Sequence, residues 1–495
     1  MSAEQEPEQP GSHGIDELIA ERRAKGLRLR ESDPGAFPYA YANVEPIERI
    51  LMAYAHLESG QETDDSHRVA GRIAARREAG KMAFLDVVDR TGKIQLHARA
   101  DVLGQDAFER LTSLDVGDIV GVDGAPLRSR RGEISLRVEA FQILSKALRP
   151  PPDKHAGLSD VQIRYRRREL DLIASADARK LFVDRAKILA AVRAYLDGEG
   201  FLEVETPVLQ PLYGGALARP FTTHHNVLDR DLYLRIATEL YLKRLIVGGL
   251  ERVYELGKDF RNEGVSSKHN PEFTVVEFYE AYADYNDAAA RLEGLVRGAA
   301  QAIDYNAELD FSSPWRRVTF VGAILGATGI DLSSVHDDDV ALAREIDARD
   351  LEITTAQASW GQMADDLLSK FVEPTLVQPT FVRDYPVELS PLARAHRSQP
   401  GLVERWEAFA GGMEIANAFS ELTDPDVQRE RFEAQQRLSA LGEEEAQPYD
   451  ELFVQALEQG MPPTGGVGLG IDRLVMLLTG ADSIREVVLF PAMRD

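Results

Sequence analysis

The chain has 495 residues, a formal net charge of −25 at pH 7 and no cysteine. This length exceeds what one hydrophobic core supports, so we expect two or more domains, and the 44% hydrophobic and 28% charged residues are typical of a soluble globular protein. The lack of cysteine excludes disulfides and thiolate zinc sites, and no apolar run of about 18 residues is present to span a membrane.

Residues 1–60 are predicted to form a partly helical N-terminal extension. The segment GIDELIAERRAKGLRLRESD is amphipathic and rich in arginine, and Pro34 and Pro38 follow it. A helix that packs on a neighbouring domain would have this pattern, and we assign the extension no role. The first residues, MSAEQEPEQPGSHG, are polar and acidic rather than signal-like, so we expect a cytoplasmic location.

Residues 61–149 are predicted to form a small β-barrel, because short runs of alternating apolar and polar residues follow one another between turn signals. From His67 to Arg149 the sequence has 15 Lys and Arg against 11 Asp and Glu, so this stretch is locally basic. Binding of a polyanion depends on local cations, so the total charge does not exclude a nucleic-acid partner. Phe84 fits either an aromatic platform for an unstacked base or the barrel core.

Three clusters of basic residues fit either a nucleic-acid surface or a solvated charged face. They are Arg76, Arg77 and Lys81; Arg128, Arg130 and Arg131; and Arg164 to Arg168. Residues 150–168, with three consecutive prolines, are predicted to be a semi-rigid linker. A second domain, 169–495, then begins with apolar residues at helical spacing, and residues around 340–372 are predicted to be a helical insertion packed on its core.

Two strand-like runs, Val253–Phe260 and Phe273–Tyr282, flank a loop with Gly, Ser, Asn and Pro signals and are predicted to form an antiparallel hairpin. Alternation places Phe273, Val275, Glu277 and Tyr279 on one face of the second strand. Each charged residue alone fits an ordinary half-exposed sheet. The close grouping of Arg261, Glu263, His269 and Glu277 instead favours a pocket for a triphosphate and a cationic small molecule.

The sequence contains neither a P-loop nor a Rossmann fingerprint, so a nucleotide would be held mainly by side chains. Arginine suits this because its guanidinium group matches phosphate oxygens and stays charged. Arg261 is one candidate. Arg473 is the other, because GVGLGIDR is predicted to be a Gly-rich strand or turn that enters a helix, although such a helix start is more often a packing feature.

A second hairpin is predicted in RWEAFAGGMEIANAFSEL, where Gly411 and Gly412 can form a two-residue turn. That turn would place Glu407 diagonal to Glu414 on one face, where two carboxylates beside phosphates suit Mg²⁺, although two exposed glutamates would look the same. Asn417 has the opposite parity to Glu414. Either a bulge near Ala416 or a rim position for Glu414 would bring both to one pocket.

These segments resemble class II lysyl-tRNA synthetases of the bacterial type. FRNE with HNPEFT and the following AYADY resembles motif 2, EGFLEVETPVLQ resembles motif 1, and GGVGLGIDRLVMLLTG resembles motif 3. The resemblance runs from about residue 65 to the end. It implies an α+β fold in which a mostly antiparallel sheet flanked by helices, 169–495, follows an OB-fold anticodon-binding barrel, 61–149. Members often carry N-terminal extensions that aid tRNA binding, so this role stays open for residues 1–60.

The resemblance also implies site roles. The residues that match those binding lysine are Gly215, Glu239, Glu277, Tyr279, Asn417 and Glu421. Those that match the ATP site are Arg261, His269, Phe273, Glu407, Glu414 and Arg473, with Arg261 and Arg473 as the catalytic residues and Glu407 and Glu414 as ligands of Mg²⁺. In the barrel, Phe84 would stack on an anticodon base, and Arg77, Gln95 and Glu133 would read base edges.

The implied reaction is activation of L-lysine with ATP, which gives lysyl-adenylate and pyrophosphate, followed by transfer of lysine to the 3′-end of tRNA(Lys). A buried ammonium requires an opposing carboxylate, so the acidic residues of this pocket favour lysine over aspartate or asparagine. Motif 1 forms the dimer interface in the family, with Pro207 at the end of its strand, so we expect a homodimer. Two alternatives remain: a relative that delivers lysine to a protein, and a non-catalytic nucleic-acid-binding or regulatory protein on the same fold.

Overall fold

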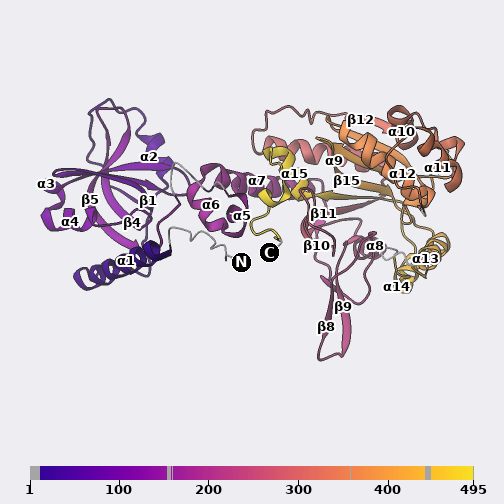
Figure 1. Cartoon of the computed structure of the whole chain (residues 1–495), viewed down its shortest axis with the longest axis horizontal. Coiled ribbons are helices and arrows are strands. Elements are labelled where there is room, and N and C mark those ends of the chain that lie inside the picture. The colour runs from indigo at the N-terminus through magenta and orange to yellow at the C-terminus, as the bar shows by residue number, and fades with distance from the viewer. Residues whose placement is uncertain (1–11, 153–157, 159, 357, 441–446, 494–495) are drawn as a thin grey trace, which may run out of the picture. The chain divides into compact units, whose positions relative to one another are not determined.

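The chain divides into two units, residues 1–159 and 160–495, and each is described by itself (Figure 1). The computed structural model describes residues 12–152, 158, 160–356, 358–440 and 447–493. Within these ranges, no helix combines the length and the apolar character needed to cross a membrane.

The first unit is built on a closed five-stranded barrel with the strand order β1-β2-β3-β5-β4. The strands are β1 His67–Ala79, β2 Met82–Val88, β3 Lys93–Arg99, β4 Ile119–Arg128 and β5 Ile134–Ser145. Alternate side chains of β2 and β3 point inward, so Leu85, Val87 and Leu96 are buried in the barrel core. The predicted barrel is therefore confirmed.

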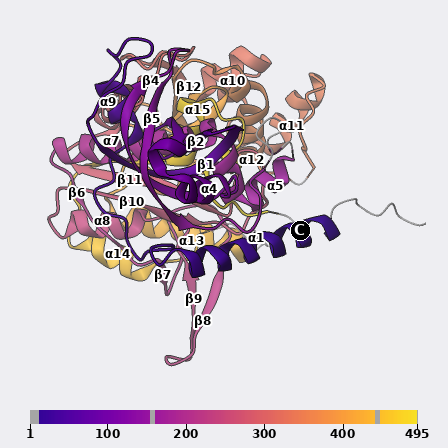
Figure 2. The same ribbon diagram turned by 90° about the vertical axis from the view of Figure 1, so that its left-hand side faces the viewer.

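Four helices accompany the barrel: α1 Ser12–Ser32, α2 Ile47–Ala53, α3 Ala100–Leu103 and α4 Gln105–Thr112. The long helix α1 runs along one side of the barrel in both ribbon views (Figures 1 and 2). Arg22 donates from Nη1 to the carbonyl oxygens of Val116 and Ala147, each at 3.1 Å, and Lys25 Nζ donates to Asp115 at 2.9 Å. At least these two cations of the Arg-rich segment therefore pack on their own unit.

The second unit contains an eight-stranded sheet with the order β12-β13-β14-β15-β16-β11-β10-β6. Its strands are β6 Leu202–Glu203, β10 Arg252–Phe260, β11 Glu272–Ala281, β12 Arg316–Thr319, β13 Thr380–Pro386, β14 Leu402–Ala410, β15 Met413–Ser420 and β16 Thr464–Gly470. Only the outer pairs β6–β10 and β12–β13 are parallel. The mostly antiparallel sheet confirms the predicted α+β class.

One face of this sheet is covered by apolar residues of the helices α7 Ala176–Gly198, α9 Tyr285–Gln301 and α15 Ile471–Thr479. Val276 and Phe278 of β11 point into this core, as does Leu292 of α9. Because successive strand residues face opposite ways, Glu277 and Tyr279 point to the other face. That face carries the candidate site described below.

The remaining helices of the second unit are α5 Val161–Arg166, α6 Arg168–Ala174, α8 Glu239–Val247, α10 Phe320–Thr328, α11 Asp339–Ala348, α12 Trp360–Leu367, α13 Pro425–Ala440, α14 Glu451–Glu458 and α16 Ile484–Val487. A small sheet of β7 Leu209–Gln210, β8 Thr222–His225 and β9 Arg230–Leu234 has the order β7-β9-β8, and its strands β8 and β9 form a projecting hairpin (Figures 1 and 2). Phe320, Leu342 and Trp360 of α10, α11 and α12 are buried in a second core that also includes Val382 of β13 and Phe409 of β14.

Two local expectations were wrong. Arg168, at the end of the third basic cluster, is only 1% exposed, and it donates to the carbonyl oxygens of Arg485, Val488 and Leu489 at 2.8–3.1 Å. It therefore belongs neither to a nucleic-acid surface nor to a solvated face. The strand β6 covers only two residues and does not reach Pro207, because Thr206 instead donates from its backbone N and its hydroxyl to a side chain, that of Glu255.

Candidate active site

One cavity of about 340 Å³ in the second unit gathers the side chains predicted to hold substrates there. Twelve predicted residues line it: Gly215, Glu239, Arg261, His269, Phe273, Glu277, Tyr279, Glu407, Glu414, Asn417, Glu421 and Arg473. They come from five strands and helices (α8, β11, β14, β15 and α15) and from the loops beside them. The structure thus brings together what the sequence disperses over 259 residues, while the ligand of each side chain stays a prediction.

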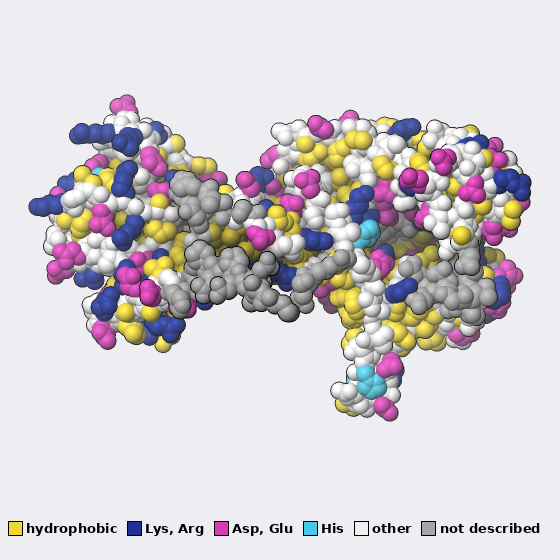
Figure 3. All heavy atoms as spheres, viewed as in Figure 1, with side chains coloured by type: hydrophobic (Ala, Val, Ile, Leu, Met, Phe, Trp, Pro, Cys, Tyr) yellow, Lys and Arg dark blue, Asp and Glu magenta, His cyan; other side chains and the backbone are white. Residues whose placement is uncertain are grey.

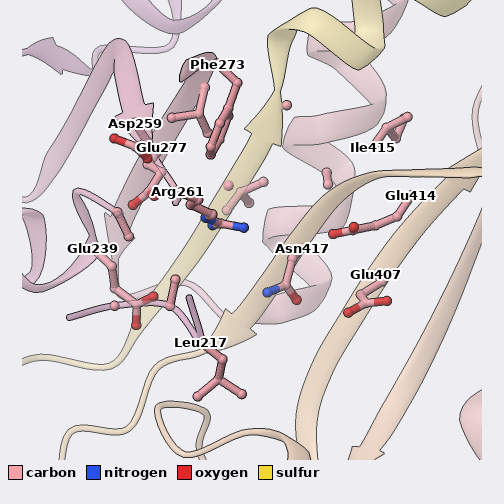
Figure 4. Close-up of a pocket in the computed structure, with 18 of the residues that line it drawn as sticks. Leu217, Glu239, Asp259, Arg261, Phe273, Glu277, Glu407, Glu414, Ile415 and Asn417 are labelled. Carbon is pink, nitrogen blue, oxygen red and sulfur yellow. The ribbon is translucent and has the colours of Figure 1, made fainter. Parts of the chain in front are cut away.

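The predicted hairpin of β10 and β11 forms the middle of the cavity, with Glu255 paired to Glu277 and Asp259 paired to Phe273. Arg261 follows the end of β10, and Figure 4 shows its guanidinium group in the centre of the cavity. The Cζ atom of Arg261 lies 5.1 Å from the centroid of the Phe273 ring, within the range of a cation–π contact. The guanidinium cation of Arg261 therefore lies in the middle of the cavity.

One end of the cavity is acidic and closed. Glu239, Glu277 and Glu421 are 6%, 8% and 1% exposed. Burial, together with the charges of Asp259 and Glu239, raises the pKa of Glu277 to about 8. Burial also raises the pKa of Glu421 to about 8, and the charge of Lys243 opposes that rise. Such an end favours a ligand that brings positive charge.

Tyr279 adds a hydroxyl group to this end, and Tyr279 OH donates to Glu277 Oε2 at 3.4 Å. The Oε1 atom of Glu421 is buried and has no hydrogen-bond partner among the described residues. A buried acceptor without a donor is costly, so a donor supplied by a ligand would be favoured there.

The second predicted hairpin, β14–β15, is confirmed in its register, with Phe409 paired to Glu414. Gly411 and Gly412 form its turn with φ values of +61° and +67°, which a residue with a side chain adopts only at a cost. The pairing then shifts, because Ala408 pairs with Ala416 and leaves Ile415 as an extra residue. This bulge turns both Glu414 and Asn417 toward the cavity and resolves their opposite parity.

Glu407 and Glu414 lie at the other end of the cavity, with their carboxylates directed to the same space (Figure 4). Burial raises the pKa of Glu407 to about 7, Arg405 opposes the rise and Glu414 adds to it. Two carboxylates directed to one space form a donor set suited to Mg²⁺, which uses one or two protein carboxylates beside phosphates. No group of three or more potential metal ligands occurs in the described part of the chain.

Arg473 lies in the first turn of α15, directly after the Gly-rich strand β16, as predicted. Its Nη1 donates to the backbone oxygen and to Oε2 of Glu414, each at 2.8 Å, and its Nη2 lies 3.3 Å from Nε2 of His269. Burial and the charge of Arg473 lower the pKa of His269, which favours the neutral imidazole. Both side chains are therefore placed beside Glu414.

Two cations of this region were missed by the sequence analysis. Arg405 donates to Asn417 Oδ1 at 3.1 Å and to Glu407 Oε1 at 2.5 Å, so it holds together two residues that are paired across β14 and β15. The signal available was its position two residues before Glu407 on a strand. Lys243 contacts Glu239 and Glu421. Its signal was the i,i+4 spacing from Glu239 on a helix.

The four barrel residues predicted to contact an anticodon lie on the outer side of β1, β2 and β3 and beside β5. Arg77 and His97 are the cross-strand partners of Phe84. The Arg77 Cζ atom is 5.0 Å from the Phe84 ring centroid, and the Phe84 and His97 rings are parallel within 8° at 4.9 Å. Phe84 is thus not a core residue.

Gln95 lies beside this stack, and its Nε2 donates to Glu133 Oε2 at 3.4 Å. The structure therefore gathers the four predicted residues in one region of the barrel surface. Figure 3 shows that basic and acidic side chains are intermingled on the visible face of this unit rather than separated. His97, which the sequence analysis did not select, is the aromatic partner that completes the stack.

Comparisons with known proteins agree with this organisation. Residues 160–494 match the family described as tRNA synthetases class II (D, K and N), and residues 67–144 match the family described as OB-fold nucleic acid binding domain. The chain is 53% identical over 492 residues to the Lysine--tRNA ligase of Synechococcus sp. (strain RCC307) and 50% identical over 492 residues to that of Thermosynechococcus vestitus; each match covers 97% of both chains. The Lysine--tRNA ligase of Carboxydothermus hydrogenoformans is 47% identical over 490 residues, 97% of this chain and 98% of that protein.

Proposed function

Because this chain belongs to the class II tRNA synthetases of the family that contains the aspartate, lysine and asparagine enzymes, we infer that it is a lysine--tRNA ligase, an ATP-dependent aminoacyl-tRNA ligase. The observation that carries the choice of lysine is the buried acidic end of the cavity. An aspartate side chain would require a cation at that end, whereas Glu239, Glu277 and Glu421 offer three carboxyl groups.

Lysine would bind with its two ammonium groups at the acidic end and its carboxylate toward Arg261. Glu421 and Tyr279 would hold the ε-ammonium, with Glu277 nearby. The contacts for the α-ammonium would come from Glu239 and Gly215, and those for the α-carboxylate from Asn417 and Arg261. All of these residues line the same cavity, which supports a single bound lysine.

ATP would occupy the other end, with its adenine between Phe273 and Arg473 and its terminal phosphates near His269. Arg261 would contact the α-phosphate. Glu407 and Glu414 would hold Mg²⁺, which neutralises phosphate charge when bound. Their convergence in Figure 4 supports this proposal.

In the first step, a carboxylate oxygen of lysine attacks the α-phosphorus of ATP, the bond to the pyrophosphate oxygen breaks, and lysyl-adenylate forms. The carboxylate is already a nucleophile, so no catalytic base is needed. Arg261 would stabilise the charge that develops on the phosphorus oxygens. In the second step, the 3′-hydroxyl of the tRNA attacks the activated carbonyl, AMP leaves and the hydroxyl proton is released.

The barrel supports tRNA as the acceptor, because a relative that delivers lysine to a protein would not need an anticodon site. Phe84 would stack on an anticodon base, and Arg77, Gln95 and Glu133 would read base edges.

We also propose a homodimer formed through the motif 1 segment. Its apolar residues Leu202, Val208 and Leu209 are 51%, 41% and 48% exposed in the single chain, which supports a partner surface there. The cytoplasmic location stays a prediction.

The experiment that tests this function is exchange of labelled pyrophosphate into ATP, run separately with each of the twenty amino acids. We expect exchange with lysine alone, followed by charging of tRNA(Lys) with labelled lysine. Exchange with aspartate or asparagine instead would refute the assignment of the acidic end. Exchange with lysine without tRNA charging would favour delivery to a protein, and no exchange at all would favour a non-catalytic protein.

A further inference from the structure

Lys243 lies next to the acidic end of the cavity, where the substrate lysine is proposed to bind, but it does not line the cavity. It is on α8, one helical turn after Glu239, and it is 0% exposed. Its Nζ donates to Glu239 Oε1 at 2.6 Å and lies 2.5 Å from Glu421 Oε2. Glu239 and Glu421 line the cavity, whereas Lys243 does not. The side chain of Lys243 therefore contacts these two proposed substrate-binding residues from outside the cavity.

The charges around Lys243 explain why a lysine can be buried there. Burial works against its ammonium, but Glu239 and Glu421 outweigh this and raise the pKa of Lys243, so it stays charged. Tyr279 of β11 lies in the same buried cluster as Leu240 and Leu242 of α8, and it experiences the charges of Glu239, Glu277 and Glu421. Without Lys243, three carboxyl groups would share one closed end with no cation there, and the pKa of Glu421 would rise further because Lys243 opposes that rise.

The two oxygens of Glu421 are in different situations. Both are buried and make no hydrogen bond within the described part of the chain, but Oε2 forms an ion pair with Lys243, with its Nζ at 2.5 Å. Gly466 of β16 leaves room beside Oε1, because a Cβ atom at that position would overlap it. One oxygen is therefore held by the protein while the other remains available to a ligand.

We propose that Lys243 is a positioning residue: it aligns the carboxyl groups of Glu239 and Glu421 before substrate arrives, so that Oε1 of Glu421 receives the distal ammonium of lysine. This inference rests on the proposed function. Lys243 does not touch the substrate. It acts by fixing the direction of the two carboxyl groups that do, and by opposing the rise of the pKa of Glu421.

The test replaces Lys243 with methionine, which has a similar length and no charge. Lysine-dependent pyrophosphate exchange by Lys243→Met should show a KM for lysine raised by about tenfold or more, because each unit of upward pKa shift removes about tenfold of the ionised carboxylate. The kcat and the KM for ATP should change by less than about twofold, since loss of binding that is equal in the ground state and the transition state raises only the KM for lysine. The rise of kcat/KM for lysine with pH should move to higher pH.

A matched control is Lys180→Met. Lys180 pairs with Asp184 at the same i,i+4 spacing on α7, but its side chain is 70% exposed and outside the cavity. Its kinetics and pH profile should equal those of the wild type. A folded Lys243→Met enzyme with the same lysine KM and pH profile as the wild type would overturn the proposal.

A double-mutant cycle with Glu421→Gln separates positioning from general stabilisation. If Lys243 acts through Glu421, Lys243→Met should add less than about twofold to the lysine KM in the Glu421→Gln background, because the effects of directly coupled residues are not additive. Should the single variant fail to fold, the double variant should recover folding, since removing both members of a buried pair is tolerated better than removing one. A double variant that is equally unfolded would refute the proposal.

These outcomes can be told apart from a failure of the proposed function. A wild-type enzyme that shows no lysine-dependent exchange would refute the proposed function itself. If the wild-type enzyme shows lysine-dependent exchange and the Lys243→Met variant has the same lysine KM and pH profile, only the role of Lys243 is refuted.

Discussion

Glu277 and Glu421 are buried carboxyl groups whose pKa values lie near 8, although their proposed role is to receive ammonium groups as carboxylates. In the empty enzyme below pH 8 they are largely protonated. Binding of a dicationic ligand must then release protons, because the ionised form is the one that pairs with an ammonium. The affinity for lysine should therefore depend on pH through the protonation of Glu277 and Glu421.

We predict that kcat/KM for lysine rises as the pH increases from 6.5 to about 8.5, because the fraction of ionised Glu277 and Glu421 grows through a pKa of about 8. Below that pKa the dependence should approach about tenfold per pH unit for one proton released. Pyrophosphate exchange at saturating ATP over this range measures it. Calorimetry of lysine binding in two buffers of different ionisation enthalpy should show proton release, and binding without proton release would contradict the prediction.

Phe84 is the second residue whose role can be isolated, because it lies in the first unit and the activation site lies in the second. Phe84→Ala should leave lysine-dependent exchange unchanged and lower the kcat/KM for tRNA charging by about tenfold or more, since stacking on a base contributes about 1–3 kcal/mol. A filter assay of charging measures this. Phe141→Ala, a change at a partly buried barrel residue, is the control, and equal charging by Phe84→Ala and wild type would remove Phe84 from the anticodon site.

At the scale of elements, the site depends on where strands depart from regularity. The hairpins β10–β11 and β14–β15 were predictable because alternation and a Gly-Gly turn fix strand pairing locally. The bulge at Ile415 was predictable only as one of two options, because parity shows that Glu414 and Asn417 conflict without showing how the chain resolves it. Contacts between distant elements, such as Lys243 with Glu421, had no local pattern that could reveal them.

The strand β16 provides an element-scale prediction. A Cβ atom on Gly466 would overlap Glu421 Oε1 and the Tyr279 ring, whereas one on Gly468 would meet Glu277 at an ordinary 3.8 Å. Gly466→Ala should therefore lower kcat/KM for lysine by about 100-fold or more while ATP still binds, because overpacking a rigid site displaces its side chains. Gly468→Ala, two residues away on the same face, should change it by less than about fivefold. Equal kinetics for the two variants would contradict this account of the lysine end.

At the scale of the whole molecule, the sequence analysis predicted the order of barrel and sheet because each carries motifs of its own. It did not predict that Arg168 is buried, since a run of arginines in sequence gives no sign of which one will meet backbone carbonyls more than 300 residues later. It also predicted that the motif 1 strand extends to Pro207. In the structure, Thr206 donates to the side chain of Glu255 instead, and Glu255 is too distant in sequence for a local pattern to reveal this contact.

The homodimer makes a prediction about the entire assembly. The wild type should sediment at twice the mass of the 54.9 kDa chain, and Leu202→Glu should sediment as a single chain, because a charge in an apolar interface is costly to desolvate. Analytical ultracentrifugation measures both. Leu325→Glu, at a residue that is 44% exposed on α10, is the control and should remain a dimer. A Leu202→Glu protein of dimer mass would exclude this residue from the interface.

The hydrogen bonds of Arg168 have a consequence for biosynthesis. Its guanidinium group, near the start of the second unit, is satisfied by carbonyl groups of residues 485, 488 and 489. While the ribosome is still translating, those acceptors do not yet exist, and an arginine without them is expensive to bury. The second unit therefore cannot reach its final packing until residues 485–489 have been synthesised, whereas the barrel has all of its strands more than 300 residues earlier and is free to fold first.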